Sequence, residues 1–432
     1  MSSRDGMFSF LRDASLLSIA TAFGYGIAFL SLPILARVYN PGAFGALATF
    51  IALGGFVAFF ATFRTEEIIV LPKDEHKAEA FTRALTLASI AVGLVVLLVI
   101  LLLVAFGVEK TFGVDRSVVI LLGPGVAFLA LTVVLRLGAV RKRLFSTIAL
   151  AVVLRAAVAF ALALAYGLWV ETDAPLGLCL GQVGGDLTAC VILGFAQRGL
   201  FVWRWPGWLA NAREVARTHG AMLATIAFSQ LIANAYAPIA VLALGIGANA
   251  SAVGWYGMAV RVIVLPSTLL ASSISDVFRQ RASESKRSGQ GIAQLVLRVR
   301  LIAAGIAALP YLVLAVGAPT LFAIFLGGQW REAGVYAAIL SISGLLSFVA
   351  GVTDRTAMIL DRSRYLMIYH SLRFAAEAVP AAGLVLHLLT PLQFVIGVAV
   401  LRSLVYCLDL LFLHVAAHRA DRVALETAAH EV

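Results

Sequence analysis

Long apolar stretches separated by short polar turns run through the whole chain. A helix needs about 20 apolar residues to cross the hydrocarbon layer of a membrane, and about twelve stretches reach that length. Their centres lie near Phe29, Gly54, Val95, Phe128, Ala159, Gly185, Ile232, Ile263, Ala307, Ser343, Ala381 and Leu404. The pattern predicts an all-α integral membrane protein with about twelve transmembrane helices.

Composition supports this fold class. The chain has 432 residues, of which 61% are hydrophobic and 13% are charged, and its mean hydropathy is +0.97. A soluble domain of this composition could not cover its surface with polar groups. No polar stretch is long enough for a separate catalytic domain. The apolar run after Asp13 is too long for the core of a signal peptide, so we expect the first helix to be retained.

The positions of the basic residues predict the topology. The net charge is +10, but these residues fall mostly in short loops between apolar stretches, which argues against a nucleic-acid partner. Most of them follow the even-numbered spans or flank the chain ends, and the opposite side has only Arg37, Lys110, Arg116 and Arg331. Because cytoplasmic loops are rich in Lys and Arg, we expect both termini in the cytoplasm.

A central hydrophilic segment divides the chain. We expect an N-terminal six-helix half over 1–200, a cytoplasmic interfacial linker over 201–218 and a C-terminal six-helix half over 219–432. The two halves align weakly, with Pro33 and Pro238 late in the first span of each. Six spans return the chain to the same side, so the halves would form a parallel repeat around a central cavity.

Three arginines lie inside apolar stretches, where each costs roughly 2.5–3.5 kcal/mol to insert. They are Arg155, Arg261 and Arg402. A guanidinium binds phosphate through two hydrogen bonds, so these residues predict a cationic cavity for a phosphate-bearing or acidic ligand. The alternative is ion pairing with buried carboxylates; Arg402 and Asp409, seven residues apart, would share a helix face. We expect Arg355 and Arg373, near span ends, to reach the membrane surface.

Other polar residues within the spans offer further sites. Asp186, Glu377 and Asp409 are candidates for cation or proton coupling, because a carboxylate in a low dielectric binds protons more readily. Their alternative role is again in structural ion pairs. Gln230 and Asn234 lie one turn apart and could bind a sugar or join helices, of which joining helices is favoured.

The sequence contains no pattern typical of a catalytic site or a metal site. Cys179, Cys190 and Cys407 lie in apolar stretches without metal-ligand spacing. No phosphate-binding loop, dinucleotide fingerprint or catalytic Ser/His/Asp set is visible. The sequence therefore predicts no catalytic residues, no metal, no cofactor and no enzyme activity.

Several segments resemble the Wzx-like polysaccharide and O-antigen flippases of the multidrug/oligosaccharidyl-lipid/polysaccharide exporter superfamily. The similar segments are 32–37, 39–41, 44–45, 64–74, 256–266, 275–278 and 330–337. They are spread over almost the whole chain, and their order and spacing carry the resemblance. One departure is Thr65-Glu66-Glu67, where the family more often shows an aromatic or small residue followed by a single acid.

The resemblance implies a transporter of undecaprenyl-diphosphate-linked glycans across the bacterial inner membrane, for O-antigen, capsule or exopolysaccharide export. Its halves would rock to expose the cavity to each side in turn. An Na⁺ gradient, an H⁺ gradient or the membrane potential would drive the cycle. Implied partners are the lipid-linked glycan, the bilayer, a polysaccharide polymerase and the chain-length machinery.

Two other functions stay open at this point. One is a cation-coupled exporter of drugs or of other lipid-linked precursors from the same superfamily, although arginines suit a cationic drug poorly. The other is a membrane glycosyltransferase or polymerase, which would be expected to carry catalytic residues in large outer loops. The outer loops predicted here are short.

Overall fold

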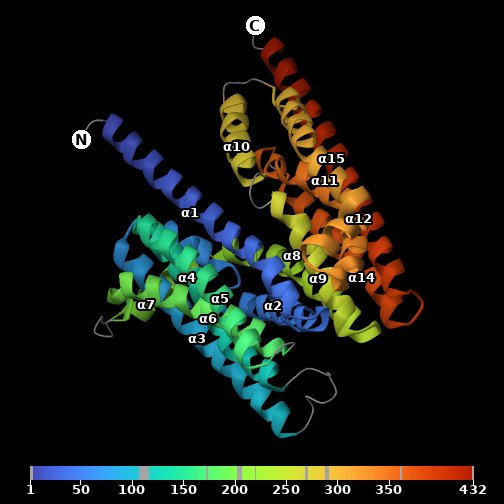
Figure 1. The fold of residues 1–432 in the computed structure, drawn as a ribbon. Coiled ribbons are helices and arrows are strands. Elements are labelled where there is room, and N and C mark those ends of the chain that lie inside the picture. Colours follow the sequence, from blue (N-terminus) through green and yellow to red (C-terminus); the bar gives the residue numbers. More distant parts are fainter. Residues whose placement is uncertain are drawn as a thin grey trace. The chain divides into compact units, whose positions relative to one another are not determined.

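The structure is a computed structural model in which the described residues are 3–106, 116–171, 174–201, 207–218, 220–267, 271–287, 291–360 and 362–430. Within these ranges the chain consists of helices and short turns, with no strand (Figure 1). The predicted all-α class is therefore confirmed. The chain forms two compact units, Met1–Pro238 and Ile239–Val432, here called the N-terminal and C-terminal units.

Among its described residues, the N-terminal unit contains six long helices, two 3₁₀ turns, one short amphipathic helix and the first part of a further long helix. The long helices are α1 (Ser3–Val38), α2 (Pro41–Thr62), α3 (Glu75–Ala105), α4 (Arg116–Arg141), α5 (Phe145–Trp169) and α6 (Pro175–Ala196). The shorter elements are η1 (Thr65–Val70), η3 (Arg198–Phe201) and α7 (Trp208–Thr218). Helix α5 packs against α1 and α6, α4 packs against α3 and α6, and α7 lies along α3.

The boundary between the units falls within α8 (Gly220–Gly247). The C-terminal unit continues with α9 (Ala250–Pro266), α10 (Ser272–Arg287), α11 (Ala293–Phe325), η5 (Gly328–Trp330), α12 (Arg331–Gly351), α13 (Thr356–Ile359), α14 (Ser363–Val385) and α15 (Pro391–His430). Its centre is α12, which packs against α9, α11 and α15, while α14 packs against α15. The predicted division into two halves with a linker at 201–218 stays a prediction.

Ten helices among the described residues are long and apolar enough to cross a membrane. Each of the twelve predicted centres lies within a helix. Two of those helices fall outside the ten: α9, whose apolar part is shorter, and α14, which carries Arg364, Arg373 and Glu377. Many large apolar side chains point outward, such as Leu98 on α3 and Leu309 on α11. The exact count of twelve spans and the two-repeat arrangement stay predictions.

Local sequence explains where two of these helices begin. The side chain of Asn40 accepts a hydrogen bond from the backbone N–H of Ala43 at 2.8 Å, at the start of α2. Asn249 accepts from Ala252 at 2.9 Å at the start of α9. Asparagine is a strong N-cap because it satisfies a backbone donor that has no partner within the helix.

Candidate functional site

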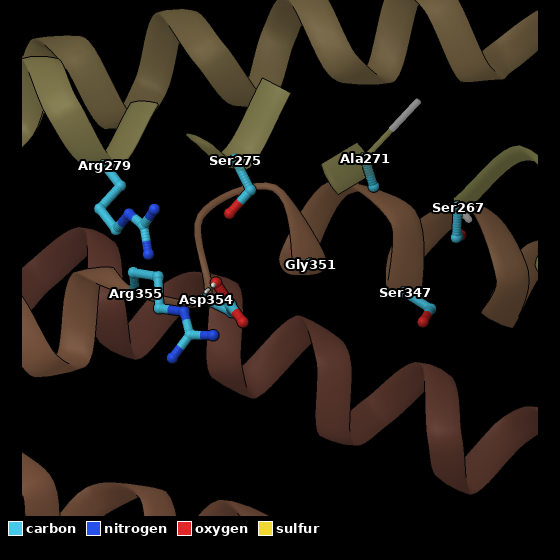
Figure 2. A pocket seen from close by; sticks show the side chains of 8 residues that line it. All are labelled: Ser267, Ala271, Ser275, Arg279, Ser347, Gly351, Asp354 and Arg355. Carbon is cyan, nitrogen blue, oxygen red and sulfur yellow. Dashed lines mark ion pairs between the residues drawn. The ribbon is translucent and has the colours of Figure 1, made fainter. Parts of the chain in front are cut away.

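A polar pocket of about 360 Å³ lies in the C-terminal unit (Figure 2). Three serine hydroxyls, two guanidinium groups and one carboxylate line it, together with two small residues. These residues are Ser267, Ser275, Ser347, Arg279, Arg355, Asp354, Ala271 and Gly351. A pocket of this size is within the range of small-ligand sites, which use a few converging polar groups to orient the ligand.

The end of α9, one face of α10 and the turn after α12 position these side chains. Ser267 follows the last residue of α9, and Ser275 and Arg279 lie four residues apart on α10, so they share one helix face. Asp354 and Arg355 lie in the turn between α12 and α13. Figure 2 shows Ser275 and Arg279 reaching from α10 toward this turn.

The side chains that line the pocket carry a net positive charge. The Arg355 Nε atom lies 3.7 Å from an oxygen of Asp354, and both side chains are about half exposed. The Ser275 hydroxyl also hydrogen-bonds to the Asp354 carboxylate. Two guanidinium groups therefore face one carboxylate. Such a pocket can bind an anion with several oxygens, because hydroxyls and guanidinium groups all donate hydrogen bonds to phosphate.

Sequence reasoning missed this pocket. It assigned Arg279 to the cytoplasmic charges that set topology, and it placed Arg355 at a span end reaching for the membrane surface. The available signals were the four-residue spacing of Ser275 and Arg279 and the adjacent Asp354 and Arg355. Neither signal shows that α10 lies beside the end of α12, so the sequence alone could not bring them together.

Arg155, predicted for the cavity, forms an ion pair in the N-terminal unit. Its Nε atom donates to an oxygen of Asp186 at 2.5 Å, and Gln182 donates to the other oxygen at 2.9 Å. Close packing of α5 and α6 makes the pair possible, because a Cβ on Gly185 would lie 2.7 Å from the Arg155 carbonyl. The Asp186 side chain is 3% exposed, whereas that of Arg155 is 41% exposed. Much of the Arg155 side chain is therefore exposed, in contrast to its buried partner.

Arg402 lies in a buried cluster in the C-terminal unit. Its Nε atom donates to Glu377 on α14, and its Nη2 atom donates to the hydroxyl of Tyr256 on α9 at 3.0 Å. The helix-face pairing of Arg402 with Asp409 is therefore not the one found. Arg373 lies over the rings of Tyr369 and Tyr406. The Arg402 cluster connects α9, α14 and α15, which favours a structural role for Arg402.

Asp409 belongs to a separate buried cluster in the same unit. It accepts a hydrogen bond from the hydroxyl of Tyr365 at 2.7 Å. Arg300 is nearby and donates to the Thr353 hydroxyl at 3.0 Å and to the Leu410 carbonyl at 2.6 Å. Sequence reasoning assigned Arg300 to a cytoplasmic loop, whereas it lies in α11 with 7% of its surface exposed.

The remaining predicted residues lie on α8 and α9. The Asn234 side-chain amide donates to the Gln230 backbone carbonyl at 2.8 Å, so these residues are joined within one helix. Arg261 is partly buried on α9. The structure thus brings together Arg155 with Asp186, and Arg402 with Glu377. The assignment of the predicted residues to substrate binding or ion coupling stays a prediction.

Comparison with known proteins shows which family the chain matches. Residues 34–335 match the model of a family described as polysaccharide biosynthesis protein. No curated protein sequence matches the chain.

Several solved structures share the fold. An inward-facing multidrug resistance MATE family transporter of the MOP superfamily is 15% identical, with a TM-score of 0.70 over 92% of this chain and 95% of that one. The lipid II flippase MurJ in an inward closed conformation is 12% identical, with a TM-score of 0.66 over 95% and 90%. An outward-facing MATE transporter is 14% identical, with a TM-score of 0.54 over 94% and 96%.

The structural similarity shows the fold. The family match over most of the chain confirms the resemblance found in the sequence. The apolar helices and the transporter fold together make the chain a multi-pass membrane protein. The chain belongs to the polysaccharide biosynthesis protein family.

Proposed function

We propose that this protein is a flippase that moves undecaprenyl-diphosphate-linked oligosaccharides from the inner to the outer leaflet of the bacterial inner membrane. The family match and the fold shared with a lipid flippase support a lipid-linked precursor as the substrate class. The glycan would serve O-antigen, capsule or exopolysaccharide export. Both termini would lie in the cytoplasm, as the distribution of basic residues predicts.

The observation that carries the proposal is the pocket with Arg279 and Arg355. A diphosphate presents several anionic oxygens, and the pocket offers two guanidinium groups and three hydroxyls to them. In the predicted topology, the end of α12 lies on the cytoplasmic side, where a lipid-linked precursor would enter. The pocket would therefore receive the diphosphate at the start of transport.

Arg155 provides a second place for an anion. Its charge is partly balanced by Asp186, but the exposed part of its guanidinium group could still donate to a phosphate or an acidic sugar. We propose Arg155 and Arg261 as further substrate contacts along the route. Asp186, Glu377 and Asp409 remain proposed sites for coupling to an Na⁺ or H⁺ gradient.

Alternating access completes the proposal. Twelve spans in two parallel halves would rock about a central cavity, as in other transporters built from repeats. The lipid tail would stay in the bilayer while the headgroup crosses. A cationic drug would meet the two guanidinium groups of the pocket, which disfavours the drug-exporter alternative.

A binding measurement tests the role of the pocket. Undecaprenyl diphosphate would be titrated into the purified protein in nanodiscs, comparing wild type with the double variant Arg279→Gln/Arg355→Gln. Because a hydrogen bond to a charged group contributes about 1.5–3 kcal/mol, we expect the dissociation constant to rise at least about tenfold. Arg281→Gln removes the same charge from an exposed position of α10 outside the pocket and serves as the control. Equal affinity in all three proteins would refute the assignment.

A further inference from the structure

A second pocket, of about 170 Å³, lies in the N-terminal unit. Its polar lining consists of Thr62, Arg64, Glu66 and Asn234, and the rest is apolar and includes Phe59. The polar groups come from the end of α2, from η1 and from α8. None of these residues belongs to the pocket with Arg279 and Arg355.

Glu66 is the unusual member of this pocket. It is 2% exposed, and its Oε2 atom is buried without a hydrogen-bond partner among the described residues. The nearest cation, Arg64, places its Nη1 atom 4.0 Å from the other oxygen, Oε1. A buried acceptor without a donor is destabilising. Glu66 therefore brings to the pocket lining a carboxylate with one acceptor oxygen that no described donor uses.

The backbone beside Glu66 is held in an unusual conformation. Phe63 and Arg64 both adopt the left-handed region, with φ of 50° and 60°. Residues other than glycine rarely do so, and such strain gathers at ligand sites and switch regions. The turn ends α2 and begins η1, which places Glu66 in the lining and leaves the neighbouring Glu67 exposed. This also distinguishes the two acids of the Thr65-Glu66-Glu67 segment.

The other groups show what kind of ligand fits. The Asn234 amide uses one N–H to reach the Gln230 carbonyl, so its oxygen and its second N–H can serve a ligand. Arg64 and Glu66 carry opposite charges, so the pocket as a whole attracts neither anions nor cations strongly. Phe59 and the α4 residues Leu129, Ala130 and Val133 supply apolar surface. The pocket is too small for a drug-sized molecule.

We propose that this pocket binds one uncharged sugar ring of the transported glycan. A sugar ring offers hydroxyl donors to the Glu66 carboxylate, acceptors to Arg64 and Asn234, and C–H groups to the apolar wall. A bare proton would need no pocket, and a metal cation would meet the guanidinium group of Arg64. The link to the glycan rests on the proposed function, whereas the binding of a free sugar can be measured by itself.

The test uses free methyl glycosides with the full-length protein in nanodiscs. Saturation-transfer NMR would measure binding of methyl glycosides of a neutral hexose, an N-acetylhexosamine and a hexuronic acid. We expect saturable signals from at least one uncharged glycoside in wild type, reduced at least fivefold in Glu66→Gln and in Asn234→Ala. Glu67→Gln removes the same charge one residue away at an exposed position and should bind as wild type does.

Several results would overturn the proposal: no signal from uncharged glycosides in wild type, binding of the uronic acid alone, or equal signals in Glu66→Gln and wild type. Asn234→Ala provides a second reading if Glu66→Gln fails to fold, as judged by size-exclusion profile and Tm. Transfer of the lipid-linked glycan by wild type would be measured separately. Glycoside binding without transfer would reject the flippase proposal and leave the sugar site standing, and transfer without glycoside binding would do the reverse.

Discussion

Arg402 shows how a charge within an apolar helix can be held by the protein itself. Both of its described partners are side chains of other helices, and the Glu377 side chain is 1% exposed. Arg155 differs, because its partner Asp186 is buried while much of its own side chain remains exposed. Two arginines that look alike in the sequence therefore have different surroundings. The first suits a structural ion pair, and the second suits a contact with a ligand.

Replacing Arg402 tests its structural role. Arg402→Met leaves Glu377 buried without its cation, so we expect the free energy of unfolding to fall by about 3–5 kcal/mol. The double variant Arg402→Met/Glu377→Leu removes both charges and should recover most of the lost stability. Tm measurements in detergent would compare wild type and the two variants. Glycan transfer that stays absent in a stable double variant would show instead that Arg402 or Glu377 acts in transport itself.

Arg155 offers the contrasting case. Arg155→Gln keeps a donor for Asp186 but removes the charge available to a ligand. Because Asp186 is left buried without its cation, we expect a lower Tm. We also expect a dissociation constant for undecaprenyl diphosphate raised about tenfold. Titration in nanodiscs checks the affinity, with Arg143→Gln, in the turn before α5, as a control for loss of a surface charge. Unchanged affinity would remove Arg155 from the binding site.

Among the helices, α2 and α9 begin alike. Asn40 and Asn249 cap their helices with the same hydrogen-bond pattern, in which each side chain accepts from the backbone N–H three residues later. This supports the predicted parallel repeat. We expect Asn40→Ala and Asn249→Ala each to destabilise the protein by about 1 kcal/mol, because each leaves one backbone donor without its partner.

Thermal unfolding in detergent would compare these two variants with Asn40→Ser and Asn249→Ser, which keep a capping oxygen. The serine variants should be nearly as stable as wild type. Equal losses for serine and alanine would contradict the capping argument at that helix.

Asp421, in the C-terminal part of α15, caps the start of α11. Asp421 accepts hydrogen bonds from the backbone N–H groups of Ile292 and Ala293, at 2.8 and 2.9 Å, where α11 begins. Asp421→Ala would free both donors and should speed hydrogen exchange of the first turn of α11, measured by mass spectrometry. Peptides from α5, in the other unit, should be unaffected. Unchanged exchange at Ile292 and Ala293 would show that the cap is not needed.

Prediction from sequence succeeded for the elements and was limited for the site. Every predicted span centre lies in a helix, because apolar length is a local property of the chain. The partners of Asp186 and Glu377 were among the pairs considered, but the choice between them depends on which helices pack together. Neither pocket was found, since Arg279 and Asp354 line one pocket, and Glu66 and Asn234 the other, through packing between segments distant in sequence.

For the whole molecule, the distribution of basic residues predicts which loops face the cytoplasm. In a variant whose three cysteines are replaced by serine, Arg331→Cys should react with a membrane-impermeant maleimide on intact inner-membrane spheroplasts. Arg362→Cys should react only after the membrane is permeabilised. The two residues flank α12 and its following turn on opposite sides in the predicted topology. The reverse labelling pattern would invert the protein and place the pocket with Arg279 and Arg355 on the outer side.

The central claim is movement of a lipid-linked glycan between leaflets, and leaflet transfer tests it most directly. Proteoliposomes would contain a fluorescent undecaprenyl-diphosphate-linked oligosaccharide and either wild type, Arg279→Gln/Arg355→Gln or Arg281→Gln. We predict transfer by wild type and Arg281→Gln, a rate at least about tenfold lower in the double variant, and an unchanged glycan. No transfer by folded wild type under an Na⁺ gradient, an H⁺ gradient or a membrane potential, or the appearance of new glycosidic products, would contradict the account.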